Sequence, residues 1–209
     1  MSQSEHNPPA SCCSQSPINL VDSVEADSPA VQFNYKAGAT QVVHGEYSVE
    51  LLFGADNGMD IEGRTFALRN VHFHVPGEHR IEGREYLLEA HAVHASEAGD
   101  IAVVAVLFEP GAAHSAFEKF LSLLPLRKGE RKSLEVELSA TAFLPSNPAC
   151  YRYSGSLTTP PYSEGVSWFV MRETLTLSQA QAEALRRTVG KDNNRPLQAL
   201  NGRRVISSR

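Results

Sequence analysis

Two stretches with strand-like alternation carry three histidines, and this pattern restricts the fold more than any other feature of the sequence. In residues 66–75, the two-residue period of a β-strand groups four side chains on one face, namely Leu68, Asn70, His72 and His74. In residues 86–95, the same period groups Leu87, Glu89, His91, Val93 and Ala95. Two glycines in the intervening residues 76–84 favour a chain reversal and an antiparallel strand pair. The three imidazoles are therefore predicted to converge on one point.

The three histidines, His72, His74 and His91, suit a catalytic zinc site. Three neutral imidazoles without a cysteine leave a fourth position for water, as in catalytic rather than structural zinc sites. A ligating histidine usually donates its second N–H to an oxygen, and Asn70 and Glu89 lie on the correct faces to accept. A lone histidine on a strand is more often an ordinary hydrogen-bonded side chain. The third histidine, in phase on a neighbouring strand, makes Zn²⁺ the predicted cofactor.

Most of the apolar content lies in predicted strands. Residues 101–108 form a continuous apolar run rich in β-branched residues, which is typical of a central strand covered on both faces. Residues 43–53 alternate between apolar and polar, which is typical of a sheet with one solvated face. The predicted fold is mainly β, a single domain with a large, mostly antiparallel mixed central β-sheet and a few short peripheral helices.

Two helices are predicted, at residues 116–124 and 179–189. Each follows a serine with an acid or amide three residues later, the spacing of a capping box: Ser115 with Glu118, and Ser178 with Gln181. Gly190 follows the second helix, at a position where glycine commonly ends a helix.

Length and charge limit the domain organisation and the partners. The 209 residues fit one domain. Residues 1–14 are rich in Ser, Pro, Asn and Gln and are predicted to be a flexible segment before a folded domain at 15–209. The formal charge of −5, without runs of like charge, gives no reason to expect nucleic acid or a membrane as partner. A small diffusible substrate is the natural alternative, and a homodimer remains open.

Targeting signals and cysteines bear on the compartment. No apolar run approaches the roughly 18 to 20 residues that span a bilayer, and the first residues lack the basic and apolar regions of a signal peptide. A cytoplasmic location is therefore favoured, with a periplasmic or secreted one if a leader has been removed. An odd number of cysteines does not predict a disulfide framework, although a bridge from Cys12 or Cys13 to Cys150 remains open.

Several motifs, taken together and in order, resemble those of the α-class carbonic anhydrases, bacterial type, with a shortened N-terminus. They are Gln15-Ser16-Pro17-Ile18, His72-Phe73-His74, Glu78-His79, Glu89-Ala90-His91, Gly155-Ser156-Leu157-Thr158-Thr159-Pro160-Pro161 and Asn194-Arg195-Pro196-Leu197. The resemblance runs from Gln15 to about Val205. It implies a catalytic domain at 15–209 that hydrates carbon dioxide reversibly to bicarbonate and a proton, by attack of zinc-bound hydroxide.

The resemblance also implies roles for individual residues. The zinc ligands would be His72, His74 and His91, oriented by Asn70, by a backbone carbonyl near Asn193 and by Glu89. Thr158 resembles the threonine that accepts the proton of the hydroxide and donates its own to Glu78. The substrate-binding residues would be Val93, Val103, Leu157, Thr159, Val166 and Trp168.

The proton shuttle of the family has no clear counterpart. Many relatives carry a shuttle histidine in the region that corresponds to residues 43–50, and two alignments place either Gly45 or Glu46 at its position. A slip of one residue reverses the face of every side chain on a strand. His44 and Glu46 are both candidates, against the alternative that each is a solvated strand residue.

Two further positions depart from the family pattern. Most relatives have glutamine where Asn70 stands. Because asparagine is one methylene shorter, either the strand moves or the bond to His72 is lost or mediated by water. We would then expect Asn70→Gln to bind zinc more tightly than the unmodified chain. Tyr162 stands where many bacterial relatives have a cysteine bridged to one before Gln-Ser-Pro-Ile, so the loop that carries Thr158 lacks that staple.

Two other classes of protein are alternatives. A cupin metalloenzyme would use His72, His74 and Glu78 as ligands, with iron or manganese, but the later Pro-x-Gly-x-x-His segment of cupins is not found. A non-catalytic carbonic-anhydrase-related binding protein would typically have lost zinc histidines, whereas all three are present here.

Overall fold

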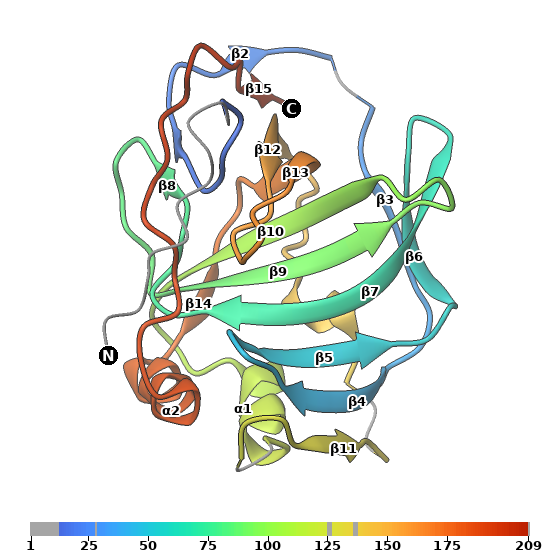
Figure 1. Ribbon diagram of the computed structural model, residues 1–209, viewed down its shortest axis with the longest axis vertical. Helices are drawn as coiled ribbons and strands as arrows, with labels where there is room; N and C mark the ends of the chain where they lie inside the picture. The colour runs from blue at the N-terminus through green and yellow to red at the C-terminus, as the bar shows by residue number, and fades with distance from the viewer. Residues whose placement is uncertain (1–12, 28, 125–126, 136–137, 209) are drawn as a thin grey trace.

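A large twisted sheet dominates the computed structural model, which describes residues 13–27, 29–124, 127–135 and 138–208 (Figure 1). The strands of the described residues are β1 (Asn19–Leu20), β2 (Val24–Glu25), β3 (Gln32–Tyr35), β4 (Ala39–His44), β5 (Val49–Phe53), β6 (Asn57–Ile61), β7 (Arg64–His74), β8 (Arg80–Ile81), β9 (Leu88–Ala95), β10 (Ile101–Pro110), β11 (Arg131–Ser133), β12 (Cys150–Ser156), β13 (Glu164–Met171), β14 (Leu175–Leu177) and β15 (Ile206–Ser207). The helices are α1 (Ser115–Ser122), α2 (Gln179–Val189) and a short 3₁₀ helix at Ala140–Phe143.

The main sheet has the strand order β11-β4-β5-β7-β9-β10-β13-β12-β15-β2, with β3, β6 and β14 attached at its sides. Most neighbours are antiparallel, whereas β10 runs parallel to both β13 and β14. The prediction of a mainly β fold with a mixed, mostly antiparallel sheet is confirmed. The long strands β7, β9 and β10 lie side by side across the middle of the molecule (Figure 1).

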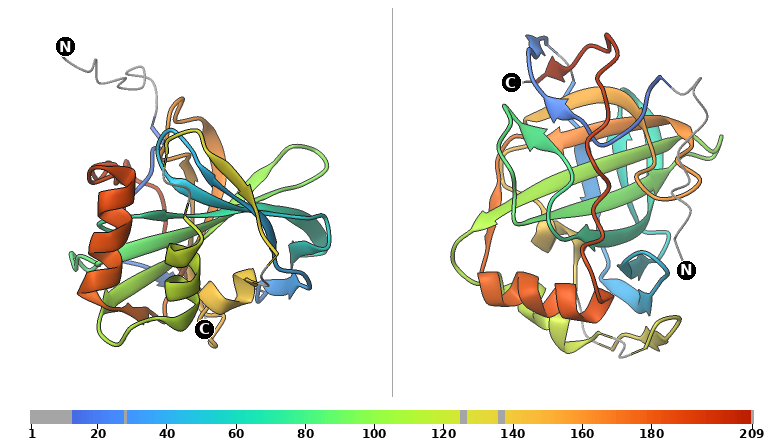
Figure 2. Two further views of the ribbon diagram at one scale, coloured as in Figure 1. Left: turned by 90° about the horizontal axis from the view of Figure 1, so that it is seen from below. Right: turned by 60° about the vertical axis from the view of Figure 1, so that its left-hand side comes forward.

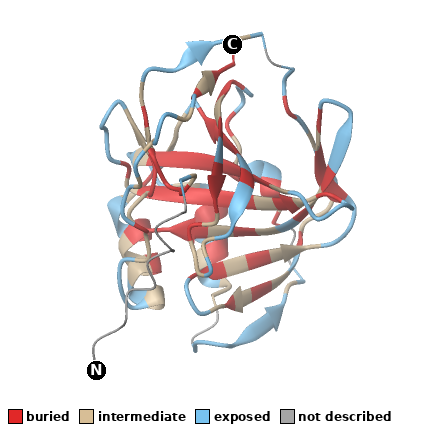
Figure 3. Cartoon of the chain, turned by 45° about the horizontal axis from the view of Figure 1, so that its top comes forward, coloured by how far each residue is buried: buried red, intermediate tan, exposed pale blue. Residues whose placement is uncertain are grey.

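Strand β10 is buried on both faces, as predicted, and separates two cores. The long strands in the middle of the molecule are largely buried (Figure 3). Val104 and Phe108 join the first core, whose centre is Phe73. The rings of Phe117, Phe120 and Phe143 lie 4.7 to 5.2 Å from that of Phe73, so α1 and the 3₁₀ helix close this face. The alternate residues Val103, Ala105 and Leu107 join the second core, with Trp168. Both helices lie on the same side of the sheet (Figure 2).

A bulge in β7 overturns one part of the predicted strand pattern. The register between β7 and β9 shifts between Leu68 and Asn70, so that Arg69 is the extra residue. An extra residue in one strand moves all preceding side chains to the opposite face. Leu68 therefore lies in the first core with Phe66 and Val71, and not beside Asn70.

The two helices differ in how well sequence predicted their starts. Helix α2 has the predicted capping box of Ser178 and Gln181, and Gly190 ends it in the left-handed conformation. Helix α1 begins one residue earlier than predicted, and the capping box of Ser115 and Glu118 is wrong. The cap is His114, whose Nδ1 accepts from the backbone N–H of Phe117 at 3.2 Å.

A contact between the helices explains this choice of cap. The side-chain oxygen of Gln181 accepts from the His114 backbone N–H at 2.9 Å, and its nitrogen donates to the His114 carbonyl at 3.0 Å. The same nitrogen donates to Glu118 Oε2 at 2.9 Å, which keeps that carboxylate from completing a box with Ser115. The start of α1 is thus fixed by α2.

The histidine cap predicts a pH-dependent stability. Burial lowers the pKa of His114 below its usual 6.5, because desolvation disfavours the charged ring. The neutral ring is also the form that can accept at Nδ1 and so cap the helix. The unfolded chain then binds the proton more readily, so this contribution is complete above pH 6.5 and is lost as the pH falls towards the lower folded pKa. His114→Ala is expected to lower the free energy of unfolding by about 1 kcal/mol at pH 7.5.

Urea unfolding between pH 7.5 and 5 tests this expectation, with His114→Asn as the control, because asparagine can cap at every pH in that range. The unmodified chain should lose more stability on acidification than His114→Asn does. Equal losses would show that the ring of His114 does not titrate on unfolding.

The described cysteines and the first described residues lie at the edges of this fold or within its core. Cys150 is a buried free thiol near Ser208 Oγ, so the bridge from Cys13 to Cys150 that the sequence leaves open is not formed, and Cys12, the other candidate, lies outside the described residues. Residues 1–12, most of the segment predicted as flexible, lie outside the described residues. Ser14 and Cys13 do have partners, since the Ser14 N–H donates to Glu164 and Asn201 donates to the Cys13 carbonyl. No helix in the described part of the chain is long and apolar enough to cross a membrane.

Candidate metal centre

The structure brings together the three histidines that the strand period predicts to converge. His72 and His91 are directly paired across β7 and β9, and His74 lies two residues further along β7. The ring centroids are 5.0 Å apart for His72 and His74, 5.3 Å for His72 and His91, and 4.5 Å for His74 and His91. One nitrogen from each ring lies within 4.8 Å of the others, which is close enough to share one metal ion.

Each imidazole has one nitrogen occupied by an oxygen acceptor. His72 Nδ1 donates to Asn70 Oδ1 at 2.8 Å, and His91 Nε2 donates to Glu89 Oε1 at 2.7 Å. His74 Nδ1 donates to the Asn193 backbone carbonyl at 3.1 Å. This fixes each ring and its tautomer, as is usual for metal-binding histidines.

The remaining nitrogens are the ones that could bind a cation: Nε2 of His72, Nε2 of His74 and Nδ1 of His91. His74 Nε2 is fully buried and has no hydrogen-bond partner. A buried polar atom of this kind is costly unless something binds it. The lone pairs of three neutral imidazoles, without a thiolate, fit Zn²⁺.

Electrostatics keep the imidazoles neutral. Burial, and then the neighbouring imidazoles, lower the pKa of His72 well below 6.5. Burial also lowers the pKa of His74 and of His91, although Glu89 opposes this in both. Neutral rings keep their lone pairs for a metal at neutral pH.

Glu89 is an orienting residue with no free capacity for a metal. Its Oε2 accepts from the backbone N–H groups of Glu78 and His79, both at 2.7 Å, and its Oε1 accepts from His79 Nδ1 at 2.6 Å as well as from His91. Burial alone would raise the pKa of Glu89, but His79 and His91 outweigh it and hold the pKa well below 4.5. Glu89 is therefore an ionised acceptor.

Sequence reasoning missed the network behind Glu89. His79 Nε2 lies 2.6 Å from Tyr153 Oη, which in turn lies 2.8 Å from Ser16 Oγ. The position of His79 directly after Glu78 could have given a signal, but its contact with Tyr153 spans 74 residues of sequence and no local pattern indicates it. The network ties the start of the described chain to the strand that carries His91.

Glu78 and Thr158 lie together beside the histidines. Glu78 is buried, and its Oε1 accepts from the Arg195 backbone N–H at 2.7 Å. Burial raises the pKa of Glu78 to about 7, while His91, the Arg195 N–H and the Thr158 side chain oppose the rise. Glu78 Oε2 has no hydrogen-bond partner and lies 3.8 Å from His91 Nε2. Thr158 is buried in the loop between β12 and β13.

An apolar surface adjoins the imidazoles. Val93 pairs with Val103 across β9 and β10, and Val103 pairs with Trp168 across β10 and β13. The Trp168 ring centroid lies 4.9 Å from that of His91. Val166 and Leu157 belong to the same second core, whereas Thr159 is half-buried in the loop after Thr158. The structure thus gathers the predicted substrate-binding residues on the side of the sheet that carries the histidines.

The structure does not bring the two shuttle candidates to the imidazoles. His44 pairs with Val49, which lies in the first core, so its side chain is on the opposite face of the sheet. Glu46 is exposed in the turn after β4. The acid on the histidine side is Glu50, the direct cross-strand partner of His72. The sequence could not show which of these residues faces the histidines, because the length of the turn between β4 and β5 determines the face on which each side chain lies.

Asn70 makes its bond to His72 directly, so neither a lost bond nor a water-mediated one is observed. The register between β7 and β9 shifts immediately before Asn70. The expectation that Asn70→Gln binds zinc more tightly therefore no longer follows.

Asn70→Leu is instead expected to weaken zinc affinity by about 10- to 100-fold, because His72 would lose its orienting acceptor. Competition with a chromophoric chelator measures the change, with Asn34→Leu as a control that removes an exposed asparagine remote from the histidines. Unchanged affinity in Asn70→Leu would mean that this bond does not orient His72.

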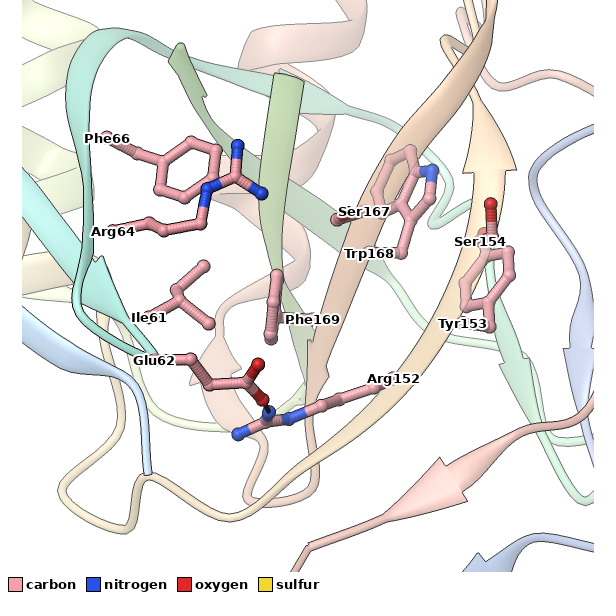
Figure 4. Close-up of a pocket in the computed structure, with 10 residues that line it drawn as sticks. All are labelled: Ile61, Glu62, Arg64, Phe66, Arg152, Tyr153, Ser154, Ser167, Trp168 and Phe169. Carbon is pink, nitrogen blue, oxygen red and sulfur yellow. Dashed lines mark ion pairs between the residues drawn. The ribbon is translucent and has the colours of Figure 1, made fainter. Parts of the chain in front are cut away.

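Figure 4 shows a cleft near the turn that joins β6 to β7. It has a volume of about 270 Å³ and lies between the turn that joins β6 to β7 and the strands β12 and β13. Ile61, Phe66 and Phe169 in its wall belong to the first core, whereas Tyr153 and Trp168 belong to the second. Its arginines already have acidic partners, Arg64 with Asp100 and Arg152 with Glu62. The cleft shares two of its lining residues with the surroundings of the histidines, because Tyr153 contacts His79 and Trp168 lies beside His91.

Comparisons of the sequence and of the structure with known proteins find carbonic anhydrases and related proteins. The family described as eukaryotic-type carbonic anhydrase matches residues 3–209. A carbonic anhydrase of Neisseria gonorrhoeae is 40% identical over 193 residues, which cover 92% of this chain and 76% of that protein. A hyperthermostable carbonic anhydrase from an active hydrothermal vent chimney has a TM-score of 0.91 at 38% identity, covering 94% of this chain and 88% of that one. The structure of dioscorin complexed with ascorbate has a TM-score of 0.83 at 31% identity, covering 93% and 85%.

Proposed function

Because the chain belongs to the eukaryotic-type carbonic anhydrase family, we propose that it hydrates carbon dioxide reversibly at a zinc ion bound by His72, His74 and His91. The prediction that the chain is a carbonic anhydrase is confirmed by the family match and by relatives of that name. The cofactor, the residue roles and the mechanism below are our proposal. The observation that carries it is the set of three oriented neutral imidazoles, one of them with a buried unpartnered nitrogen.

Zinc, when bound, would lower the pKa of a water from about 15.7 to about 7, as it does in this family, and so supply a nucleophile at neutral pH. Asn70, Asn193 and Glu89 each hold one imidazole with its free nitrogen towards the shared point. The short hydrogen bond from His91 to the ionised Glu89 carboxylate would raise the basicity of the His91 ring. The ring would then be a stronger electron-pair donor to the metal.

Thr158 and Glu78 would aim the nucleophile. Glu78 Oε1 is occupied by the Arg195 N–H, which leaves Oε2 to accept the proton of the Thr158 hydroxyl. The Thr158 oxygen could then act only as an acceptor towards the nucleophile, whose lone pair would face the substrate. A divalent cation beside Glu78 would also favour its ionised form, against the rise that burial causes. This is preorganisation rather than acid–base catalysis.

The apolar surface suits the substrate. Carbon dioxide is small and uncharged and donates no hydrogen bond, so it gains most from an apolar wall beside the nucleophile. Val93, Val103 and Trp168 would provide that wall, with Leu157 and Val166, and Thr159 would lie at its polar edge.

Stopped-flow hydration of carbon dioxide by zinc-loaded protein, with and without a chelator, tests the proposal. We expect hydration that is lost when the metal is stripped and restored when zinc is added back. Metal analysis of the same samples should give one zinc per chain. Hydration that persists in metal-free protein would refute a zinc mechanism.

The same assay decides between this proposal and a non-catalytic relative. The structural similarity to dioscorin shows that the fold also occurs in a protein not named for carbon dioxide hydration. A zinc-loaded chain without hydration activity would favour such a role. The cupin alternative is wrong, because the chain belongs to another family and Glu78, the ligand that it requires, has Oε1 committed to Arg195.

A further inference from the structure

We propose that Tyr162 is a positioning residue for this reaction, because its ring holds Arg195 in place and the Arg195 backbone N–H in turn orients Glu78. The inference rests on the proposed function, in which Glu78 and Thr158 aim the nucleophile. It assigns a purpose to a tyrosine that no role in the metal centre or the apolar wall explains.

Arg195 joins three segments that are distant in sequence. Its guanidinium Nη1 donates to Gln15 Oε1 at 2.8 Å and to the Ser16 carbonyl at 2.7 Å. Its backbone N–H donates to Glu78 Oε1 at 2.7 Å. Two residues earlier, the Asn193 carbonyl accepts from His74. The position of this short segment therefore affects both a metal-binding histidine and Glu78.

Tyr162 covers the guanidinium. The carbon at the centre of the Arg195 guanidinium lies 3.8 Å from the centroid of the Tyr162 ring, whereas the other arginine–aromatic contacts among the described residues span 5.2 to 5.7 Å. A contact this close combines cation–π attraction with stacking. Arg195 is also largely buried, at 9% exposure, so the ring replaces solvent over its face.

The backbone of Tyr162 is held in an unfavourable conformation that keeps the ring in place. Its φ is +60°, a left-handed value that is uncommon for a bulky residue. The Tyr162 carbonyl accepts from Gln15 Nε2 at 3.2 Å, and its N–H donates to the Thr159 carbonyl at 2.9 Å. Tyr162 is thereby connected on one side to Arg195 and Gln15, and on the other to the turn that carries Thr158 and Thr159.

The two groups that orient the Glu78 carboxylate thus come from two segments, which meet where the Tyr162 ring stacks on the Arg195 guanidinium. The Arg195 N–H on Oε1 comes from residues 193–195, and Thr158 comes from the loop between β12 and β13. The ring of Tyr162 belongs to that loop and packs on the side chain of Arg195. Removing the ring should let the two segments move independently and leave Glu78 less well fixed.

The experiment compares Tyr162→Leu with Tyr162→Phe, both of which keep a side chain at the left-handed position. Leucine removes the aromatic face, and phenylalanine retains it. Tyr151→Leu is a matched control, because it removes another tyrosine–arginine contact, to Arg172 at 5.7 Å. Two quantities are measured for zinc-loaded protein: kcat and KM for carbon dioxide per bound zinc, and the hydrogen exchange rate of the Arg195 amide by NMR.

In Tyr162→Leu, we expect kcat per bound zinc to fall about tenfold with KM unchanged, which corresponds to about 1.4 kcal/mol. We also expect the Arg195 amide to exchange about tenfold faster. Tyr162→Phe should restore both values, and Tyr151→Leu should change neither.

Each other result has a definite meaning. An Arg195 amide that exchanges at the original rate in Tyr162→Leu would overturn the inference. So would faster exchange with unchanged kcat, or a phenylalanine variant as impaired as leucine. Faster exchange together with no hydration activity in the unmodified protein would instead refute the proposed function. The contact between Tyr162 and Arg195 would then exist without the reaction that it is argued to serve.

Discussion

Replacing His91 with alanine is expected to abolish zinc binding and reduce carbon dioxide hydration to the uncatalysed background. His91 is the only one of the three histidines on β9, so its loss would leave a cation with two imidazoles from a single strand. Three protein ligands are the usual minimum for a catalytic zinc. The variant would also leave Glu89 without one of its two histidine donors. Metal content after dialysis and stopped-flow hydration measure the two effects.

His94→Gln is the matched control for that substitution. His94 lies on the same strand but on the opposite face, where it is buried and its Nε2 bonds the Tyr35 hydroxyl at 2.8 Å. Glutamine can retain a polar contact there, so we expect normal zinc content even if the melting temperature falls. Full activity in His91→Ala, or loss of zinc in both variants alike, would contradict the assignment of the ligands.

Thr158→Val should produce the second largest effect, a fall of about 10²-fold in kcat/KM with zinc still bound. Valine has the shape of threonine without the hydroxyl, so Glu78 Oε2 would lose the donor that we propose for it. A nucleophile that is free to rotate spends less time aimed at the substrate, and misplacement on the scale of 1 Å can cost about 10²-fold.

Thr158→Ser separates the hydroxyl from the methyl group. Serine keeps the donor, so its kcat/KM should stay within a few-fold of the unmodified chain, a range that corresponds to less than about 1 kcal/mol. If serine is as impaired as valine, the hydroxyl is not the group that matters. If valine is fully active, the proposed chain from Thr158 to Glu78 has no part in the reaction.

The sequence predicts the strand pairing and the two-sided burial of β10 because these depend on side-chain period and local turns. The same period fails at Leu68, because a single extra residue at Arg69 reverses the face, and nothing in the local composition marks the bulge. The face of His44 could not be predicted either, since it depends on the turn after β4.

Contacts between segments that are distant in sequence account for the features that the sequence did not predict. The cap of α1 is chosen by Gln181, 67 residues away, and the partner of His79 is Tyr153. Local spacing therefore predicts Ser115 as a cap where the folded chain uses His114. The convergence of the three histidines could be predicted from sequence because their spacing follows one strand pair, whereas the network behind them depends on the packing of the whole sheet.

The segment 193–195 has a consequence for the order of events in folding. Its Asn193 carbonyl meets His74 across 119 residues of sequence, and its Arg195 N–H meets Glu78 across 117. A chain still being synthesised could therefore pair β7 with β9 and gather three imidazoles long before His74 gains its acceptor or Glu78 its donor. An early, loosely held cation would become a well-ordered one only when this late segment docks, so metal retention would report on the completion of the fold.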